Sequence, residues 1–239
     1  DITITEDDGD HYTYSTLPFG FISTEDTVIT VCINETTIIN DLMSGRFIKD
    51  FNIHKRTRFL LQLQYAISKK YLQYLKQIDR ASQRVQNQLD KAMRNSELSE
   101  MLDLEKSLVY FSTSLRSNTV VLDKLPKYVK FFEEDEDLWE DVLIENRQAI
   151  EMSNIYRDIL NGTMDTYASI ISNNLNVAMK VLTSLTLIVA VPSMIGSFWG
   201  MNTGVPFESQ PWGFWVVIGI SVIICAAIAI ILYKKKMLK

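Results

Sequence analysis

The chain has 239 residues, of which 47% are hydrophobic and 22% charged, and its formal net charge at pH 7 is −5. The residues after 179 hold five lysines and one glutamate, a net charge of +4, so residues 1–179 carry a net charge of −9. Such an acidic N-terminal part argues against nucleic acid as a partner and suits a domain that handles cations. Only two histidines occur, His11 and His54, and there is no glycine-rich phosphate loop, so the sequence predicts neither an enzyme nor a nucleotide-binding protein.

Residues 1–45 are predicted to belong to one domain, and within it residues 1–40 have the patterns of β-strands. Short runs of β-branched and aromatic residues occur at 12–14, 19–22 and 28–33, separated by acidic residues, glycine and proline. The chain begins at Asp1 without an initiator Met or a signal peptide, and we expect it to be a fragment or a processed product. The strands are therefore predicted to be the remainder of a cytoplasmic α/β domain whose other strands come earlier.

Residues 46–136 change to a helical pattern. Hydrophobic side chains recur at steps of three and four residues along this stretch. We predict an antiparallel hairpin of two helices, over 52–94 and 98–125, and expect Pro126 to end the second helix because proline lacks a backbone N–H.

Residues 137–199 are predicted to form one helix. Apolar residues keep helical spacing throughout, and no proline occurs between Pro126 and Pro192. At 1.5 Å per residue, these 63 residues would span about 95 Å, which is too long to be buried within one small domain. We therefore expect the helix to pack against copies of itself around an axis.

Two membrane-length apolar segments close the chain. Val181–Trp199 has 19 residues without a charge, and Phe214–Tyr233 has 20. About 20 apolar residues in a helix cross a hydrocarbon core of about 30 Å. Cys225, inside the second segment, is interpreted as a small core residue. The predicted organisation is a stalk over 137–178, a first transmembrane helix over 179–200, an external loop over 201–213, a second transmembrane helix over 214–233 and a basic tail over 234–239.

Basic residues predict the orientation of this membrane hairpin. Lys180 precedes the first apolar segment, four lysines follow the second, and the loop between the segments has no Lys or Arg. Basic residues favour the cytoplasmic side of a membrane. We expect a multi-pass protein of the plasma membrane with both termini in the cytoplasm.

This C-terminal region resembles the CorA divalent-cation channels. The likeness rests on the segment Asn176-Val-Ala-Met-Lys-Val-Leu-Thr, on Pro192 and on Gly200-Met201-Asn202, followed by a short loop, a second apolar segment and a lysine cluster. It covers most of the chain. The resemblance implies an α+β membrane protein, in which a long stalk helix continues into the first of two transmembrane helices, assembled in the lipid bilayer as a homopentameric funnel. Thr203 departs from the family pattern, since a Phe often follows the tripeptide.

The resemblance also implies a path for ions through the first transmembrane helix. Gly200, Met201 and Asn202 would form a selectivity filter, with Glu208 in the external loop. Mg²⁺ dehydrates reluctantly, so a ring of Asn202 amide oxygens would suit an ion that keeps its water shell. Met179 and Leu182 would form a hydrophobic gate that closes by dewetting. The other pore-lining residues would be Ser197, Ser193, Ala190, Thr186 and Asn176.

Acidic residues suggest regulation by the transported ion. A run of carboxylates at 133–137 opens the stalk, and such a run is ordinarily a solvated surface. In CorA channels, ions bound between subunits hold the closed state, and by position Asp141 and Asp165 match two such regulatory acids. The N-terminal candidates for a partner acid are Asp7, Asp8 and Asp10. The resemblance thus implies magnesium transport driven by the membrane potential and gated by internal Mg²⁺, which would be both cargo and regulator.

Other interpretations stay open on the sequence. The loop sequence Gly204-Val205-Pro206-Phe207-Glu208 diverges from the family, as it does in ZntB-type zinc transporters, so Zn²⁺, Co²⁺ or Ni²⁺ could be the cargo. Proton coupling would need a site outside the two spans, which contain no acid or His. A two-span scaffolding or signalling protein is a different class, but 14 residues at 200–213 are too few for a sensing domain. Taken alone, Gly200–Asn202 could also be a simple helix cap.

Overall fold

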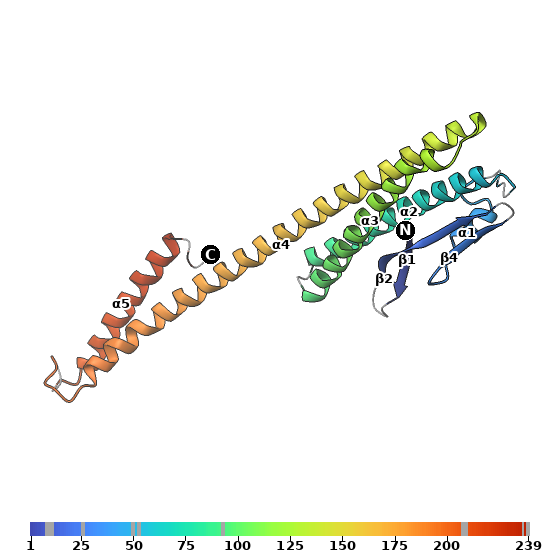
Figure 1. Cartoon of the computed structure of the whole chain (residues 1–239). Coiled ribbons are helices and arrows are strands. Elements are labelled where there is room, and N and C mark those ends of the chain that lie inside the picture. Colours follow the sequence, from blue (N-terminus) through green and yellow to red (C-terminus); the bar gives the residue numbers. More distant parts are fainter. Residues whose placement is uncertain are drawn as a thin grey trace. The chain divides into compact units, whose positions relative to one another are not determined.

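The structure, a computed structural model, describes residues 1–7, 12–24, 27–48, 51, 54–91, 94–206, 210–235 and 237 (Figure 1). Two compact units make up the chain, Asp1–Met164 and Asp165–Lys239. Helix α4 (Glu136–Trp199) begins in the first unit and ends in the second. Among the residues named above, Asp8, Asp10, His11, Phe207 and Glu208 lie outside the described residues.

The first unit opens with two β-hairpins. β1 (Ile2–Asp7) pairs antiparallel with β2 (Tyr12–Leu17), and β3 (Phe19–Ser23) pairs antiparallel with β4 (Val28–Cys32). Within the part of the chain that the structure describes, these are two separate two-stranded sheets. Pro18 lies between β2 and β3, where it cannot donate to a ladder, and this explains why the strands do not run on as one.

Three helices follow in the first unit: α1 (Ile38–Met43), α2 (Arg56–Lys91) and α3 (Asn95–Tyr128). The predicted helical hairpin is α2 and α3. Pro126 does not end α3, contrary to the sequence-based expectation. In the last turn a proline removes only its own N–H, and the Val129 N–H still donates to the Leu125 carbonyl at 2.9 Å.

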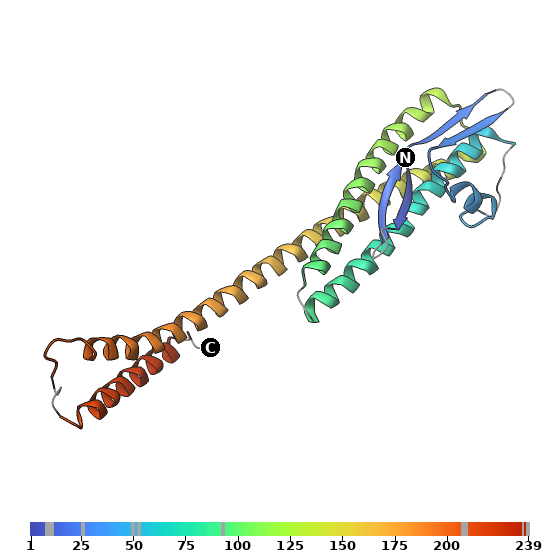
Figure 2. The same ribbon diagram turned by 90° about the horizontal axis from the view of Figure 1, so that it is seen from below.

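The core of this unit forms where the β1–β2 hairpin packs on α2 and α3 (Figure 2). The Tyr14 ring centroid lies 5.6 Å from that of Tyr74 and 6.3 Å from that of Phe111, and Tyr71 and Phe111 are 5.2 Å apart. Such aromatic clusters contribute a large share of the free energy of burial. The first part of α4 joins α3 through Ser153, whose hydroxyl donates to the Leu108 carbonyl at 3.1 Å.

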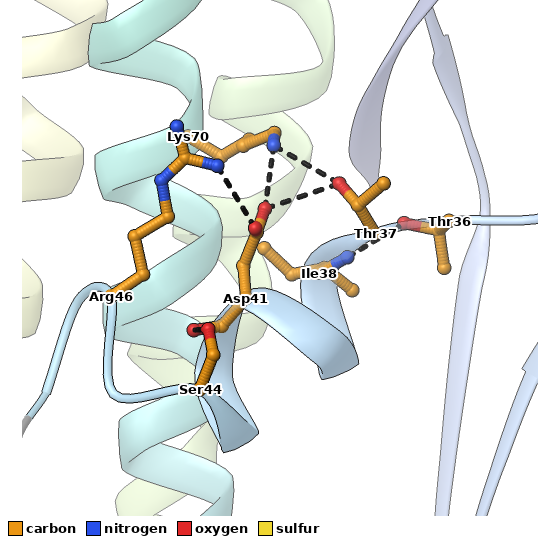
Figure 3. A network of polar contacts seen from close by, with 7 residues as sticks. All are labelled: Thr36, Thr37, Ile38, Asp41, Ser44, Arg46 and Lys70. Carbon is orange, nitrogen blue, oxygen red and sulfur yellow. Dashed lines mark hydrogen bonds and ion pairs between the residues drawn. The ribbon is translucent and has the colours of Figure 1, made fainter.

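A polar network holds the short helix α1 against α2 (Figure 3). The Lys70 Nζ donates to one Asp41 carboxylate oxygen at 2.7 Å and to the Thr37 hydroxyl at 3.1 Å, and Arg46 donates to the other Asp41 oxygen at 3.0 Å. The Lys70 and Asp41 side chains are only 10% and 12% exposed. Burial raises the pKa of Asp41, but the hydrogen bonds from Lys70 and Arg46 outweigh it and hold the pKa below its ordinary value.

This network predicts a pH-dependent contribution to stability. Because the folded-state pKa of Asp41 lies below the unfolded-state pKa of about 3.9, the contribution is complete above that pH and is lost as the pH falls through the folded-state pKa. We expect Asp41→Asn to lower the free energy of unfolding by about 2 kcal/mol at neutral pH, with the difference shrinking in acid. Thermal unfolding of the full chain in detergent, at neutral and at acidic pH, measures this effect. The control is Asp123→Asn, which changes an exposed aspartate. If Asp41→Asn lowers the stability by the same amount at neutral and acidic pH, the prediction is contradicted.

The second unit contains the last part of α4, a loop and α5 (Gly213–Lys234). Both helices have segments long and apolar enough to cross a membrane. The two helices run antiparallel: the Cys225 thiol donates to the Ile188 carbonyl, with an S···O distance of 3.4 Å, and the Ser184 hydroxyl lies 3.4 Å from the Met237 carbonyl oxygen.

Candidate functional site

Small and hydroxyl side chains form a polar stripe along the last part of α4, made of Thr186, Ala190, Ser193 and Ser197. All four are exposed in the single chain. The Thr186 hydroxyl donates to the Leu182 carbonyl at 2.8 Å, and the Ser193 and Ser197 hydroxyls donate to carbonyls one turn back at 3.0 and 2.8 Å. Since their protons are used inside the helix, the hydroxyl oxygens keep lone pairs as acceptors. The stripe can therefore accept hydrogen bonds from water bound to a cation.

The polar stripe lies on the face of α4 turned away from α5. Ile188 contacts α5 through Cys225. At about 100° per residue, Ser193 and Ser197 lie roughly 140° and 180° around the helix from Ile188. Met179 and Leu182 continue the stripe and are 53% and 57% exposed. Asn176, one turn earlier, is exposed as well.

An apolar groove lies on the other side of α4, between α4 and α5. Its volume is about 1030 Å³, and Pro192, Gly196 and Phe214 are among the residues that line it. None of the stripe residues lines the groove. Within one chain, α5 therefore partners the apolar side of α4 and leaves the polar stripe uncovered.

The tripeptide Gly200-Met201-Asn202 follows directly where α4 ends. The Gly200 N–H still donates to the Gly196 carbonyl at 3.0 Å, and a Cβ at position 200 would lie 3.4 Å from that oxygen. A larger residue at 200 would thus press on the last turn of the helix. Among the described glycines only Gly45 has a positive φ, so Gly200 does not form a left-handed helix cap. Met201 and Asn202 are both exposed beyond the helix end.

Cys225 has a role that the sequence analysis missed. Pro192 has no N–H, so the carbonyl of Ile188, four residues earlier, lacks its helical donor. The Cys225 thiol of α5 donates to this oxygen. A proline inside a span is the signal that could have predicted such a contact, because in lipid an orphaned carbonyl needs a donor from a neighbouring helix.

The two candidate regulatory acids belong to different units of the chain. Asp141 lies in the first unit and Asp165 is the first residue of the second, and both side chains are exposed. No group of three or more His, Cys, Asp or Glu side chains suited to a metal is found among the residues described. In the acidic run, Glu134 pairs with Lys55, and the buried Asp135 pairs with Arg58 at 2.7 Å, so part of the run is not a solvated surface.

Comparison with known proteins places the chain in a family. The model of the family described as CorA-like Mg²⁺ transporter protein matches residues 2–235. The chain belongs to this CorA-like family. The resemblance predicted from Gly200–Asn202 and its surroundings is therefore confirmed, and the family is one of transporters rather than enzymes.

Two curated relatives are each named cobalt/magnesium transport protein CorA. The one from Methanocaldococcus jannaschii is 34% identical over 161 residues, which cover 66% of this chain and 51% of the relative. The one from Thermotoga maritima is 29% identical over 190 residues, which cover 76% of this chain and 53% of the relative. The chain thus spans about half the length of these relatives.

A solved full-length CorA has the same fold. The complete structure of the CorA magnesium transporter from Methanocaldococcus jannaschii matches 96% of this chain and 78% of its own, with a TM-score of 0.73 and 27% identity. The predicted fold class, a mixed α/β N-terminal part, a long helix and two apolar helices, is therefore confirmed.

Proposed function

We propose that this CorA-family chain forms a homopentamer that conducts Mg²⁺ across the plasma membrane, with Co²⁺ as a second cargo. The polar stripe of α4 carries this proposal, because α5 leaves it uncovered and it leads to Gly200–Asn202. Five chains around an axis would place the five stripes on one pore and α5 toward lipid. The names of both curated relatives, cobalt/magnesium transport protein, support these two cargoes.

The chemistry of the pore residues suits a hydrated divalent ion. Mg²⁺ keeps its water shell, and rings of Asn202 amide oxygens and stripe hydroxyl oxygens would accept hydrogen bonds from that water. Each α4 C-terminus would add partial negative charge at the outer mouth. Met179 and Leu182 would close the inner part of the pore by excluding water. A potential of 100 mV contributes about 4.6 kcal/mol for a divalent ion, at ~2.3 kcal/mol per charge, which is enough to drive entry.

Ion uptake by proteoliposomes tests this function. We expect Mg²⁺ and Co²⁺ to enter when an inside-negative potential is imposed, and a pH gradient alone to have no effect. Zn²⁺ entry that needs a pH gradient would instead indicate that the protein is a proton-coupled zinc transporter. Absence of uptake of all three ions would contradict the proposal.

We further propose that Mg²⁺ held between subunits at Asp141 and Asp165 stabilises the closed state, with both termini in the cytoplasm. Loss of these ions would leave facing carboxylates that repel one another and loosen the pentamer. Asp141→Ala combined with Asp165→Ala is expected to raise the internal Mg²⁺ concentration that halves uptake by about tenfold or more. The matched control is Asp123→Ala with Asp158→Ala, both exposed aspartates. Unchanged inhibition in the first variant disproves the assignment.

A further inference from the structure

Pro192 leaves one backbone acceptor of α4 without its ordinary donor. Helix α4 continues through Pro192, so the Ile188 carbonyl, four residues earlier, lacks the N–H that would donate to it in a regular helix. The proline ring also presses on this carbonyl, which makes the helix prone to bend here. In the hydrocarbon region no water can compensate, so the carbonyl needs a donor from a neighbouring side chain.

Side chains from both helices donate to the carbonyls at this break. The Cys225 thiol of α5 donates to the Ile188 carbonyl, with an S···O distance of 3.4 Å. The Ser193 hydroxyl of α4 donates to the next carbonyl, that of Val189, at 3.0 Å. Of these two bonds only the first joins the two helices. It is therefore the bond through which α5 acts on the local geometry of α4 at the proline.

The place of this contact along the helix pair gives it influence over the outer part of α4. On its inner side, the Ser184 hydroxyl lies 3.4 Å from the Met237 carbonyl oxygen, so the chain around α5 also holds α4 there. From Ile188 to Gly200 the apolar groove lies between the helices. Among the residues that the structure describes, no hydrogen bond joins α5 to α4 beyond Ile188. The Cys225 bond is thus the last one before the segment that leads to the filter turn.

We infer that Cys225 is a positioning residue for the proposed pore: by holding the Ile188 carbonyl, it fixes the course of α4 beyond Pro192. A helix can bend by different amounts at a proline, and a donor held in α5 selects one of these bends. The selected course carries the outer part of the polar stripe, Ser193 and Ser197, to the filter turn. The effect on transport rests on the proposed function, whereas the contact itself does not. Helix α5 thereby shapes the pore as well as facing lipid.

A double-mutant cycle between positions 192 and 225 tests this inference. We expect Cys225→Ala to lower the initial rate of Mg²⁺ uptake by proteoliposomes about threefold, the factor that corresponds to a typical interhelical hydrogen bond in a membrane protein. Cys225→Ser keeps a donor and should retain the wild-type rate. Pro192→Ala restores the backbone N–H at position 192, so in that background Cys225→Ala should have no further effect.

The matched control is Ser221→Ala. Ser221 lines the same groove one turn from Cys225, but its hydroxyl donates within α5, to the Val217 carbonyl at 2.8 Å. This variant should leave uptake unchanged with and without Pro192→Ala. Thermal unfolding of the same variants in detergent measures the contact without transport. There the loss of stability caused by Cys225→Ala should shrink when Pro192→Ala is present, because only the loss of packing then remains.

Two results in the uptake measurements overturn the inference. Wild-type uptake in Cys225→Ala, or an equal loss in Cys225→Ser, shows that the thiol donor does not position the pore. An equal effect of Cys225→Ala with and without Pro192→Ala shows that this side chain acts by packing alone. If Pro192→Ala by itself abolishes uptake, the unfolding cycle decides between these results. Coupling in the unfolding cycle without Mg²⁺ uptake by the wild type supports the contact and rejects the proposed function alone.

Discussion

Replacing Asn202 by Ala should reduce Mg²⁺ uptake by roughly one to two orders of magnitude. A hydrogen bond to a charged group contributes about 1.5–3 kcal/mol, and each 1.4 kcal/mol is about a factor of ten in rate. In a pentamer the substitution removes five amides at once from the place where the ion first exchanges bulk water for the protein. The alanine side chain cannot replace the lost acceptors for the ion's water shell.

The measurement is the initial rate of Mg²⁺ uptake at a fixed inside-negative potential. Asn87→Ala is the matched control, because Asn87 is an exposed asparagine of α2, in the first unit. The chain should remain folded, since Asn202 is exposed beyond the end of α4. Uptake by Asn202→Ala at the wild-type rate would place the filter elsewhere, even if the protein transports Mg²⁺.

A polar gate should give a pore that no longer closes. Met179 and Leu182 are large apolar side chains on the same side of α4 as the polar stripe. A ring of such side chains closes a pore by expelling water, and an amide in their place would keep the pore wet. We expect Leu182→Asn, alone or with Met179→Asn, to raise uptake at inhibitory internal Mg²⁺ by about tenfold or more.

The control for the gate is Ile223→Asn. Ile223 is a 69% exposed residue of α5, so this variant places one asparagine in the second span, as Leu182→Asn does in the first. It should insert with the same difficulty yet leave inhibition by internal Mg²⁺ intact. If Leu182→Asn is inhibited as strongly as the wild type, Leu182 does not form the gate.

The secondary structure was largely predictable because it depends on local patterns. The helical period of the apolar residues and the scarcity of proline predict a helix over 137–199, and α4 runs over Glu136–Trp199. The length of the second apolar run likewise predicts α5. A local signal failed at Pro126, which lies late enough in α3 for the helix to continue past it. In the last turn of a helix a proline removes only its own N–H, so it did not end the helix there.

The candidate site divides in the same way. The sequence by itself determined the family, because Gly200–Asn202 directly follows a membrane-length apolar run. It also determined which residue types form the polar stripe, because these residues follow one another at helical spacing along a single helix. Only the tertiary structure decided which side of α4 meets α5, since that depends on packing between helices. The Cys225 contact with Ile188 joins residues 37 apart, and the Lys70 contact with Asp41 joins residues 29 apart. Such contacts arise only when the folded chain leaves a carbonyl or carboxylate in need of a partner and brings a donor within reach.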